Sequence, residues 1–145
     1  MRDKNIGFIG LGNVGSKIAY NILQNKNYSL YVFDLNKKTS KKLVSEGAIL
    51  CNSIEELIYN VTVFITCLPS PSSVKNVLLN AISFLNKDHL WIEMSTTDEE
   101  EMKMLSNLIF KKKAAVLEAP ITGGQHTAES GNISILVAGS KKTFN

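Results

Sequence analysis

The chain has 145 residues, of which 44% are hydrophobic and 20% charged, a composition typical of a folded globular domain. Its net charge of +3 comes almost entirely from dispersed lysines, Arg2 being the only arginine, which argues against a nucleic-acid-binding surface. No stretch approaches about 18 uninterrupted apolar residues, so we expect no membrane span. The first predicted strand begins at about Asn5, which leaves no room for a targeting peptide, so we expect a cytoplasmic protein.

Short apolar runs alternate with amphipathic segments along the chain. The runs predict strands over residues 6–9, 30–33, 47–50, 61–67, 90–94, 115–117 and, after a glycine-rich loop, 133–137. Helices are predicted over 12–24, 37–45, 53–59, 72–84 and from Thr97 or Asp98 to about 110, and residues 139–145 resemble the start of another. This alternation predicts an α/β fold with a doubly wound, mostly parallel sheet of the Rossmann type.

The first predicted strand runs directly into a G-x-G-x-x-G motif. Gly10 permits a tight turn, Gly12 lets the backbone approach a pyrophosphate, and Gly15 lets the following helix lie close to the sheet. Free backbone N–H groups at the start of that helix favour phosphate groups. The motif therefore predicts a dinucleotide-binding site.

An acidic residue, Asp34, ends the second predicted strand, nineteen positions after Gly15. A carboxylate at this point of a dinucleotide site accepts hydrogen bonds from the adenosine ribose hydroxyls, and it repels a 2′-phosphate. Asp34 therefore favours NAD over NADP, although Lys37 and Lys38 lie near enough to soften the preference.

Three later strands are each followed by a candidate segment: Leu68-Pro69, whose proline ends the strand, the hydroxyl-bearing Ser95-Thr96-Thr97, and the flexible Thr122-Gly123-Gly124. The carboxyl ends of parallel strands meet at one edge of the sheet, where ligands of open α/β folds bind. Helix capping explains one of the hydroxyls at 95–97, and the N–H groups of a Gly-Gly loop can hold a carboxylate. We therefore expect these segments to contribute to the same site.

The remaining candidates for chemistry are isolated in the sequence. Cys51 and Cys67 fall in predicted strands with apolar neighbours, so we expect two buried, reduced thiols. His89 is expected to be structural and His126 to be exposed to solvent. No metal site is predicted, because nothing around these residues has the spacing of metal ligands.

Taken in order, the motifs GFIGLGNVG, Asp34, CLPSPSSVKNVL, IEMSTTD and EAPITGGQHTAESGNISILVAG occur in the amino-terminal domain of β-hydroxyacid dehydrogenases. The chain resembles the 3-hydroxyisobutyrate dehydrogenase branch over essentially its whole length. That branch includes tartronate semialdehyde and glyoxylate/succinic semialdehyde reductases, and 6-phosphogluconate dehydrogenase is a more distant relative.

The resemblance implies roles for named residues. It implies a pyrophosphate cradle at Gly10, Leu11, Gly12, Asn13 and Val14, NAD selection by Asp34, and nicotinamide contacts at Leu68, Pro69 and Thr96. For substrate binding it implies Thr122, Gly123 and Gly124, with Ser95 helping to orient the substrate. Thr122 stands where the family has a serine, and Thr127 stands where it usually has a glycine. We therefore expect a different backbone path in the loop after Gly124, and the motifs do not identify which hydroxy acid is the substrate.

The resemblance also implies parts beyond Asn145: a catalytic lysine, the last strand of the nucleotide domain, and a helical domain that forms a dimer. We therefore expect residues 1–145 to be an NAD(P)-binding domain cut before its last strand and inactive alone. The whole enzyme, expected to be a homo-oligomer, would transfer a hydride between NAD and a short 3-hydroxy acid. The alternative is a non-catalytic dinucleotide-binding or interaction module of the same fold.

Overall fold

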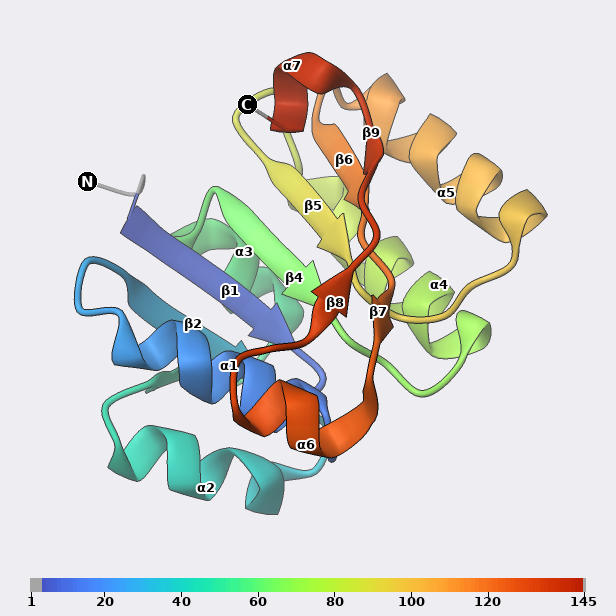
Figure 1. Cartoon of the computed structure of the whole chain (residues 1–145). Coiled ribbons are helices and arrows are strands. Elements are labelled where there is room, and N and C mark those ends of the chain that lie inside the picture. The colour runs from blue at the N-terminus through green and yellow to red at the C-terminus, as the bar shows by residue number, and fades with distance from the viewer. Residues whose placement is uncertain (1–3, 145) are drawn as a thin grey trace.

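The computed structural model describes residues 4–144, in which a seven-stranded sheet has the order β3-β2-β1-β4-β5-β6-β9 (Figure 1). Six strands are parallel: β1 (Asn5–Ile9), β2 (Ser29–Phe33), β3 (Ile49–Leu50), β4 (Val63–Thr66), β5 (Leu90–Glu93) and β6 (Ala115–Glu118). The last, β9 (Ala138–Gly139), is antiparallel to β6. The predicted α/β fold with a mostly parallel sheet is therefore confirmed, and the strand order reverses between β1 and β4.

Helices cover both faces of the sheet. One face carries α1 (Gly15–Gln24), α2 (Lys37–Ser45) and α6 (Gly124–Glu129), and the other carries α3 (Ile54–Asn60), α4 (Pro71–Ala81) and α5 (Glu99–Lys111) (Figure 1). The 3-10 turn η2 (Ile82–Phe84) extends α4, and α7 (Lys141–Phe144) ends the described chain. No helix within residues 4–144 is long and apolar enough to cross a membrane.

Alternating side chains of the central strands build two separate cores. Phe8 and Ile65 pack against α1 and its neighbours, whereas Ile9 and Phe64 pack against α3, α4 and α5. Both faces of a parallel sheet that is covered by helices must be apolar, and this explains the nearly continuous hydrophobic runs in these strands.

Side chains cap most of the crossover helices. Asn36, Ser53, Ser70 and Asp98 each accept a backbone N–H in the first turn of α2, α3, α4 and α5, respectively. Of the two residues predicted to cap α5, Asp98 is the one that does so. By contrast, α1 follows Val14, with no side-chain cap and no acidic residue in its first turn. No side chain of the described residues therefore occupies this end of α1, where the N–H groups of Ser16 and Lys17 donate to the carbonyls of Gly12 and Val14.

The segment after β6 differs from the prediction. Instead of one strand over 133–137, β8 (Ser134–Ile135) pairs antiparallel with β7 (Ile121–Thr122), and β9 joins the main sheet. The glycine-rich loop contains the unpredicted helix α6, which starts after Gly123 at a φ of +116°. We call residues 121–139 the strap, because they cross over the sheet in front of β4 and β5 (Figure 1).

The strap is fastened to α1 through α6. Ala128 is fully buried, its carbonyl accepts a 2.7 Å hydrogen bond from Asn21 Nδ2, and Lys17 Nζ lies 3.2 Å from Glu129 Oε2. The helix predicted from residue 12 begins only at Gly15, because residues 12–14 form the turn that leaves β1.

Candidate functional site

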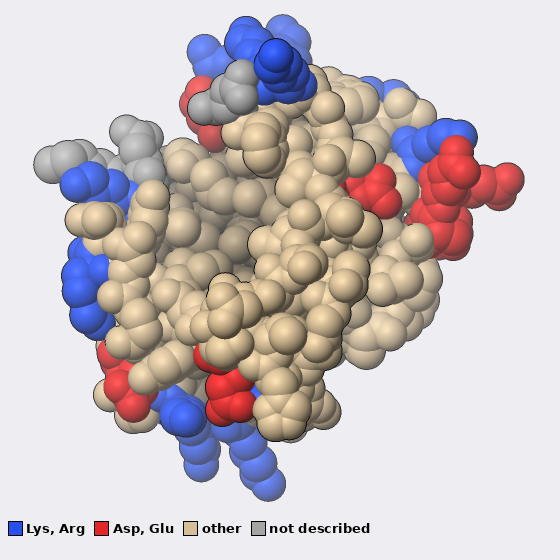
Figure 2. Space-filling model, viewed as in Figure 1, with Lys and Arg blue, Asp and Glu red and all other residues tan. Residues whose placement is uncertain are grey.

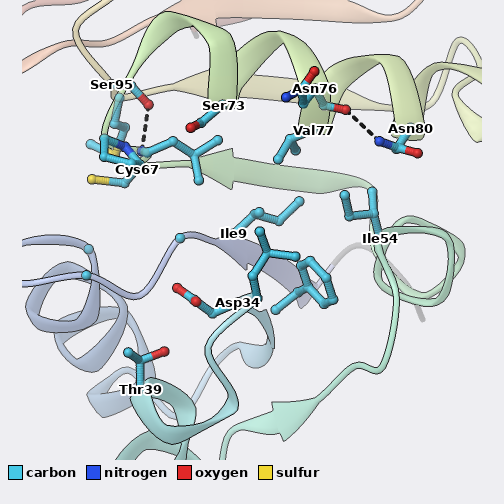
Figure 3. Close-up of a pocket in the computed structure, with 18 of the residues that line it drawn as sticks. Ile9, Asp34, Thr39, Ile54, Cys67, Ser73, Asn76, Val77, Asn80 and Ser95 are labelled. Carbon is cyan, nitrogen blue, oxygen red and sulfur yellow. Dashed lines mark hydrogen bonds between the residues drawn. The ribbon is translucent and has the colours of Figure 1, made fainter.

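A cavity of about 1150 Å³ opens at the carboxyl ends of β1, β2, β4 and β5, where the strand order reverses. Figure 3 shows Asp34 and Thr39 on one side of it, and Cys67, Ser73, Asn76 and Ser95 on the opposite side. Open α/β sheets bind their ligands at such a reversal of strand order.

The structure brings most of the predicted site residues to this cavity. Its wall includes Gly10, Gly12, Asn13, Val14, Asp34, Leu68, Pro69, Ser95 and Thr96. Leu11 is buried beneath the glycine turn. The predicted trio Thr122, Gly123 and Gly124 lies outside the wall, to which only the preceding residue, Ile121, contributes.

Two glycines of the turn are required by close packing, and a third leaves room. Gly10 has a φ of +96°, and a Cβ there would lie 2.3 Å from the Cys67 carbonyl oxygen. A Cβ on Gly15 would lie 2.1 Å from the Gly10 oxygen, whereas one on Gly12 would meet no atom within 4 Å. The space outside Gly12 and the uncapped start of α1 together fit a bound phosphate group.

Asp34 ties the glycine turn to the end of β2. Its Oδ2 accepts the Leu11 N–H and its Oδ1 accepts the Asn36 N–H, both at 2.7 Å. A carboxylate has about four acceptor sites, so about two remain for a ligand. Asp34 therefore holds the turn in place and can still accept hydroxyl groups.

On the other side of the cavity, the loops after β4 and β5 are tied to each other. Leu68 N–H donates to Ser95 Oγ at 2.8 Å, and Ser95 N–H donates to Glu93 Oε1 at 2.5 Å. Glu93 Oε2 accepts a short hydrogen bond from the Thr66 hydroxyl, which itself accepts the Trp91 Nε1–H at 2.8 Å.

Glu93 is fully buried, and burial raises the pKa of its carboxyl even though hydrogen bonds from Ser95 and Thr66 act in the opposite direction. Glu93 was not among the site residues predicted from the sequence. The available signal was Trp91 two positions earlier, because alternate residues of a strand share a face and so Glu93 had to enter the same core as the indole.

Cys67 corrects the expectation of a buried strand residue. It follows β4, it is partly exposed, and it lines the cavity. Burial, and secondarily the nearby Glu93, raises the pKa of its thiol to about 11, so it is a thiol and not a thiolate at neutral pH. Within the described range 4–144, no group of three or more His, Cys, Asp or Glu is arranged to bind a metal.

A second part of the wall was not predicted as a site, although Ser73, Asn76 and Val77, to which no role was assigned, lie within the motif CLPSPSSVKNVL. It comes from the end of β2, the start of α3 and one face of α4, and includes Phe33, Leu35, Ile54, Ser73, Asn76, Val77 and Asn80. Those on α4 follow the three- and four-residue spacing of one helix face, which is the signal that could have found them.

The Gly-Gly segment of the strap packs on its own helix. Thr127 Oγ1 donates to the Gly124 carbonyl at 3.0 Å, and a Cβ on Gly123 would lie 2.5 Å from the same hydroxyl oxygen. Thr127 therefore fills the space over Gly123, and α6 begins immediately after this residue.

A parallel sheet with two-sided helical cover, a glycine turn between β1 and α1, and a cavity at the reversal of strand order together define a Rossmann-type domain. The family model of the NAD-binding domain of 6-phosphogluconate dehydrogenase matches residues 5–145, and the chain belongs to this family.

Individual relatives agree with this assignment. The chain is 34% identical to a probable mitochondrial 3-hydroxyisobutyrate dehydrogenase of Dictyostelium discoideum, over 98% of this chain and 45% of that protein. It is 29% identical to the cytokine-like nuclear factor N-PAC of Pongo abelii, over 98% of this chain and 26% of that protein. The structure of 3-hydroxyisobutyrate dehydrogenase from Mycobacterium tuberculosis with L-serine has the same fold, with a TM-score of 0.91 and 24% identity over 98% of this chain and 48% of that one. The chain thus spans less than half of each of these proteins.

Proposed function

We propose that the chain is the nucleotide-binding portion of an NAD-dependent oxidoreductase that transfers a hydride between NAD and a short 3-hydroxy acid. The observation that supports this most directly is the cavity at the strand reversal, with the open space over Gly12 and the uncapped start of α1 in its wall. Family membership and the Dictyostelium relative support the reaction class.

In this proposal the residues around the glycine turn bind the two phosphates through backbone N–H groups, and Asp34 accepts the ribose hydroxyls with its remaining acceptor sites. The 2′-phosphate of NADP would lie close to the Asp34 carboxylate and be repelled by it. The repulsion between two unit charges about 4 Å apart near a protein surface is about 4 kcal/mol, so NAD is preferred over NADP. The nicotinamide, when bound, supplies the hydride acceptor or donor.

The substrate end of the site lies at β4 and β5. Leu68, Pro69 and Thr96 contact the nicotinamide and keep water from it, and the Ser95 hydroxyl faces the substrate. The resemblance assigns the substrate carboxylate to Thr122, Gly123 and Gly124, which lie on the strap outside the cavity wall and directly after Ile121, which lines it. The proton is moved by a lysine outside this chain, so residues 1–145 alone bind the cofactor and do not turn over substrate.

Calorimetric titration of the chain with NADH and, separately, with NADPH tests this proposal. We expect micromolar binding of NADH, with NADPH at least about tenfold weaker. NADH at a hundred times its dissociation constant should also raise the free energy of unfolding by about 2.7 kcal/mol. If the chain binds neither nucleotide, the proposal is wrong. If this chain alone turns over 3-hydroxyisobutyrate, the proposal that the proton is moved by a lysine outside residues 1–145 is wrong.

We propose further that the whole enzyme is a homo-oligomer and that it works in the cytoplasm, although the Dictyostelium relative is named as mitochondrial. The strap carries three exposed apolar side chains, Ile135, Leu136 and Val137, at 44%, 63% and 43% exposure. The middle of the face in this view is largely uncharged (Figure 2), and the strap's own acidic residue, Glu129, is paired with Lys17. Sedimentation at rising concentration should show self-association, and a strict monomer at about millimolar concentration would count against this surface as a contact.

A second candidate is a non-catalytic dinucleotide-binding or interaction module. It is favoured by the likeness to N-PAC, whose name describes a nuclear factor and not a dehydrogenase. The coding sequence after codon 145 distinguishes the two. A G-x-G-x-x-K-x-x-N-like segment supports the enzyme, and a stop codon supports the module.

A further inference from the structure

Glu93 is the only acidic side chain in the core formed by residues 4–144, and it is completely inaccessible to solvent. Burying a carboxyl group is costly unless hydrogen bonds compensate it, and apolar side chains of similar volume often stabilise a core at least as well. The position of Glu93 at the last residue of β5, next to the cavity, therefore calls for a specific role.

The hydrogen bonds of Glu93 lead to the cavity wall. Its Oε1 accepts the N–H of Ser95, and Ser95 Oγ in turn accepts the N–H of Leu68 at 2.8 Å. Its Oε2 is fixed by the Thr66 hydroxyl at the end of β4, which Trp91 Nε1 holds from within the core. One buried side chain thus sets the positions of both loops that leave β4 and β5.

The two loops form one half of the cavity. Cys67, Leu68, Pro69, Ser95 and Thr96 all line it, on the side opposite Asp34 (Figure 3). In a doubly wound fold the dinucleotide lies across the strand reversal, with one nucleotide on each half of the sheet. The glycine turn and Asp34 belong to the adenosine half, so the half that Glu93 supports receives the nicotinamide.

We propose that Glu93 is a positioning residue for the nicotinamide half of the site. It holds Ser95 in place and, through Ser95, also Leu68, and these two residues form the part of the wall that contacts the nicotinamide and the substrate. This inference rests on the proposed function. Glu93 itself touches neither cofactor nor substrate, because it is covered by the residues that it orients.

The test compares two ligands that differ only in the nicotinamide. The wild-type chain and the variants Glu93→Gln and Ser95→Ala are titrated with NADH and with ADP-ribose, which lacks the nicotinamide ring. Glu93→Gln keeps the volume and one carbonyl acceptor but replaces the other oxygen with an amide donor, which disturbs the bond to Thr66. We expect NADH to bind about tenfold more weakly to Glu93→Gln, the effect of about one lost hydrogen bond, while ADP-ribose binding changes by less than about twofold.

Two further variants separate positioning from general loosening of β5. Ile92→Val removes one methylene from the neighbouring residue, which faces the other core, and should leave the NADH to ADP-ribose ratio at its wild-type value. In the double variant Glu93→Gln/Ser95→Ala, the losses in NADH binding should not add, because the two changes break successive bonds of one chain that runs from Thr66 through Glu93 and Ser95 to Leu68.

The outcomes are distinguishable. If the wild-type chain binds neither ligand, the proposed function fails and this inference fails with it. If the wild-type chain binds both and Glu93→Gln weakens both equally or neither, Glu93 is not a positioning residue while the proposed function stands. If Glu93→Gln does not fold, Ser95→Ala alone decides, because it removes the last bond of the same chain, from Leu68 N–H to Ser95 Oγ. A loss confined to NADH supports the inference, and an equal loss of both ligands overturns it.

Discussion

The half of the cavity formed by β1 and β2 is shaped mainly by backbone geometry, whereas the half formed by β4 and β5 is shaped by buried side chains. In the first half, Gly10 and Gly15 pack against backbone atoms, and Asp34 accepts two backbone N–H groups, one from Asn36 and one from Leu11, 23 positions away. In the second half, hydrogen bonds from Thr66 to Glu93 and from Leu68 to Ser95 each join residues 27 positions apart. Both halves join residues that are distant in the sequence, since Gly10 packs against Cys67 and Leu11 is bonded to Asp34 in the first half. The difference is that the first half depends on close backbone packing, whereas the second depends on buried polar side chains.

The largest effect that this comparison predicts comes from Gly15→Ala in the first half. The new Cβ would lie 2.1 Å from a backbone oxygen that cannot rotate away, so we expect the free energy of unfolding to fall by about 3 kcal/mol or more. Urea unfolding followed by the fluorescence of Trp91, the chain's single tryptophan, measures it. Gly12→Ala is the matched control, with nearly wild-type stability but weakened NADH binding. Equal stability of Gly15→Ala and wild type would contradict the packing argument.

In the second half, Thr66→Val should be the most damaging conservative change. It keeps the shape of the side chain but leaves the buried Trp91 Nε1 and Glu93 Oε2 without the hydroxyl that joins them. We expect a loss of about 2–3 kcal/mol in urea unfolding, because unsatisfied buried polar groups are costly. Thr66→Ser retains the hydroxyl and should lose distinctly less. Similar losses in the two variants would mean that packing, and not the hydroxyl, matters at this position.

Asp34→Ala tests whether the first half also recognises the ribose. We expect NADH binding to weaken by about 1.5–2 kcal/mol, the loss of hydrogen bonds to a charged acceptor, while NADPH binding weakens less or improves. Calorimetric titration with both nucleotides measures the difference. Equal losses would indicate that Asp34 only holds Leu11 and Asn36 in place and does not read the ribose.

The smallest effect we predict is a dependence of stability on pH that originates in Glu93. Burial raises the pKa of this carboxyl above its ordinary value of 4.5, with the neighbouring Glu118 adding in the same direction and hydrogen bonds opposing both. The folded state therefore binds the proton more tightly than the unfolded state. The free energy of unfolding should fall as the pH rises from about 4.5 through the folded-state pKa.

Glu93→Gln removes this titration and leaves the other groups in place. Urea unfolding of both proteins between about pH 4.5 and pH 8 should therefore show a steeper decline for the wild type. Parallel stability profiles would show that Glu93 titrates alike in the folded and unfolded states.

The sequence predicted the parts of the fold whose signals are local. Strands β1 to β6 are apolar runs bounded by glycine, proline or capping residues, and the glycine turn and Asp34 follow from fixed spacing. The strap was predicted wrongly because residues 133–137 look like one continuous strand. In the structure only Ser134–Ile135 of this run forms a strand, in which Ile135 pairs with Ile121, and the next strand begins after the run, where Ala138 pairs with Glu118. No local pattern specifies a choice between distant partners.

The candidate site shows the same division. Gly10 and Asp34 were identified from spacing alone, whereas Glu93 was not, because an acidic residue at the end of a strand is usually exposed to solvent. Only the sheet register, which places Glu93 beside Thr66, shows that it is buried and bonded. The face of α4 that lines the cavity was missed for a similar reason, since its position depends on how the helix packs.

The outermost strands of the sheet, β3 and β9, are each only two residues long. A long outer strand offers a row of unpaired N–H and C=O groups to which a strand of another molecule can add, and this is a common origin of fibrillar aggregates. Strands of two residues give such an addition very little backbone to pair with. Copies of this chain should therefore meet through their side chains and not extend one another's sheets.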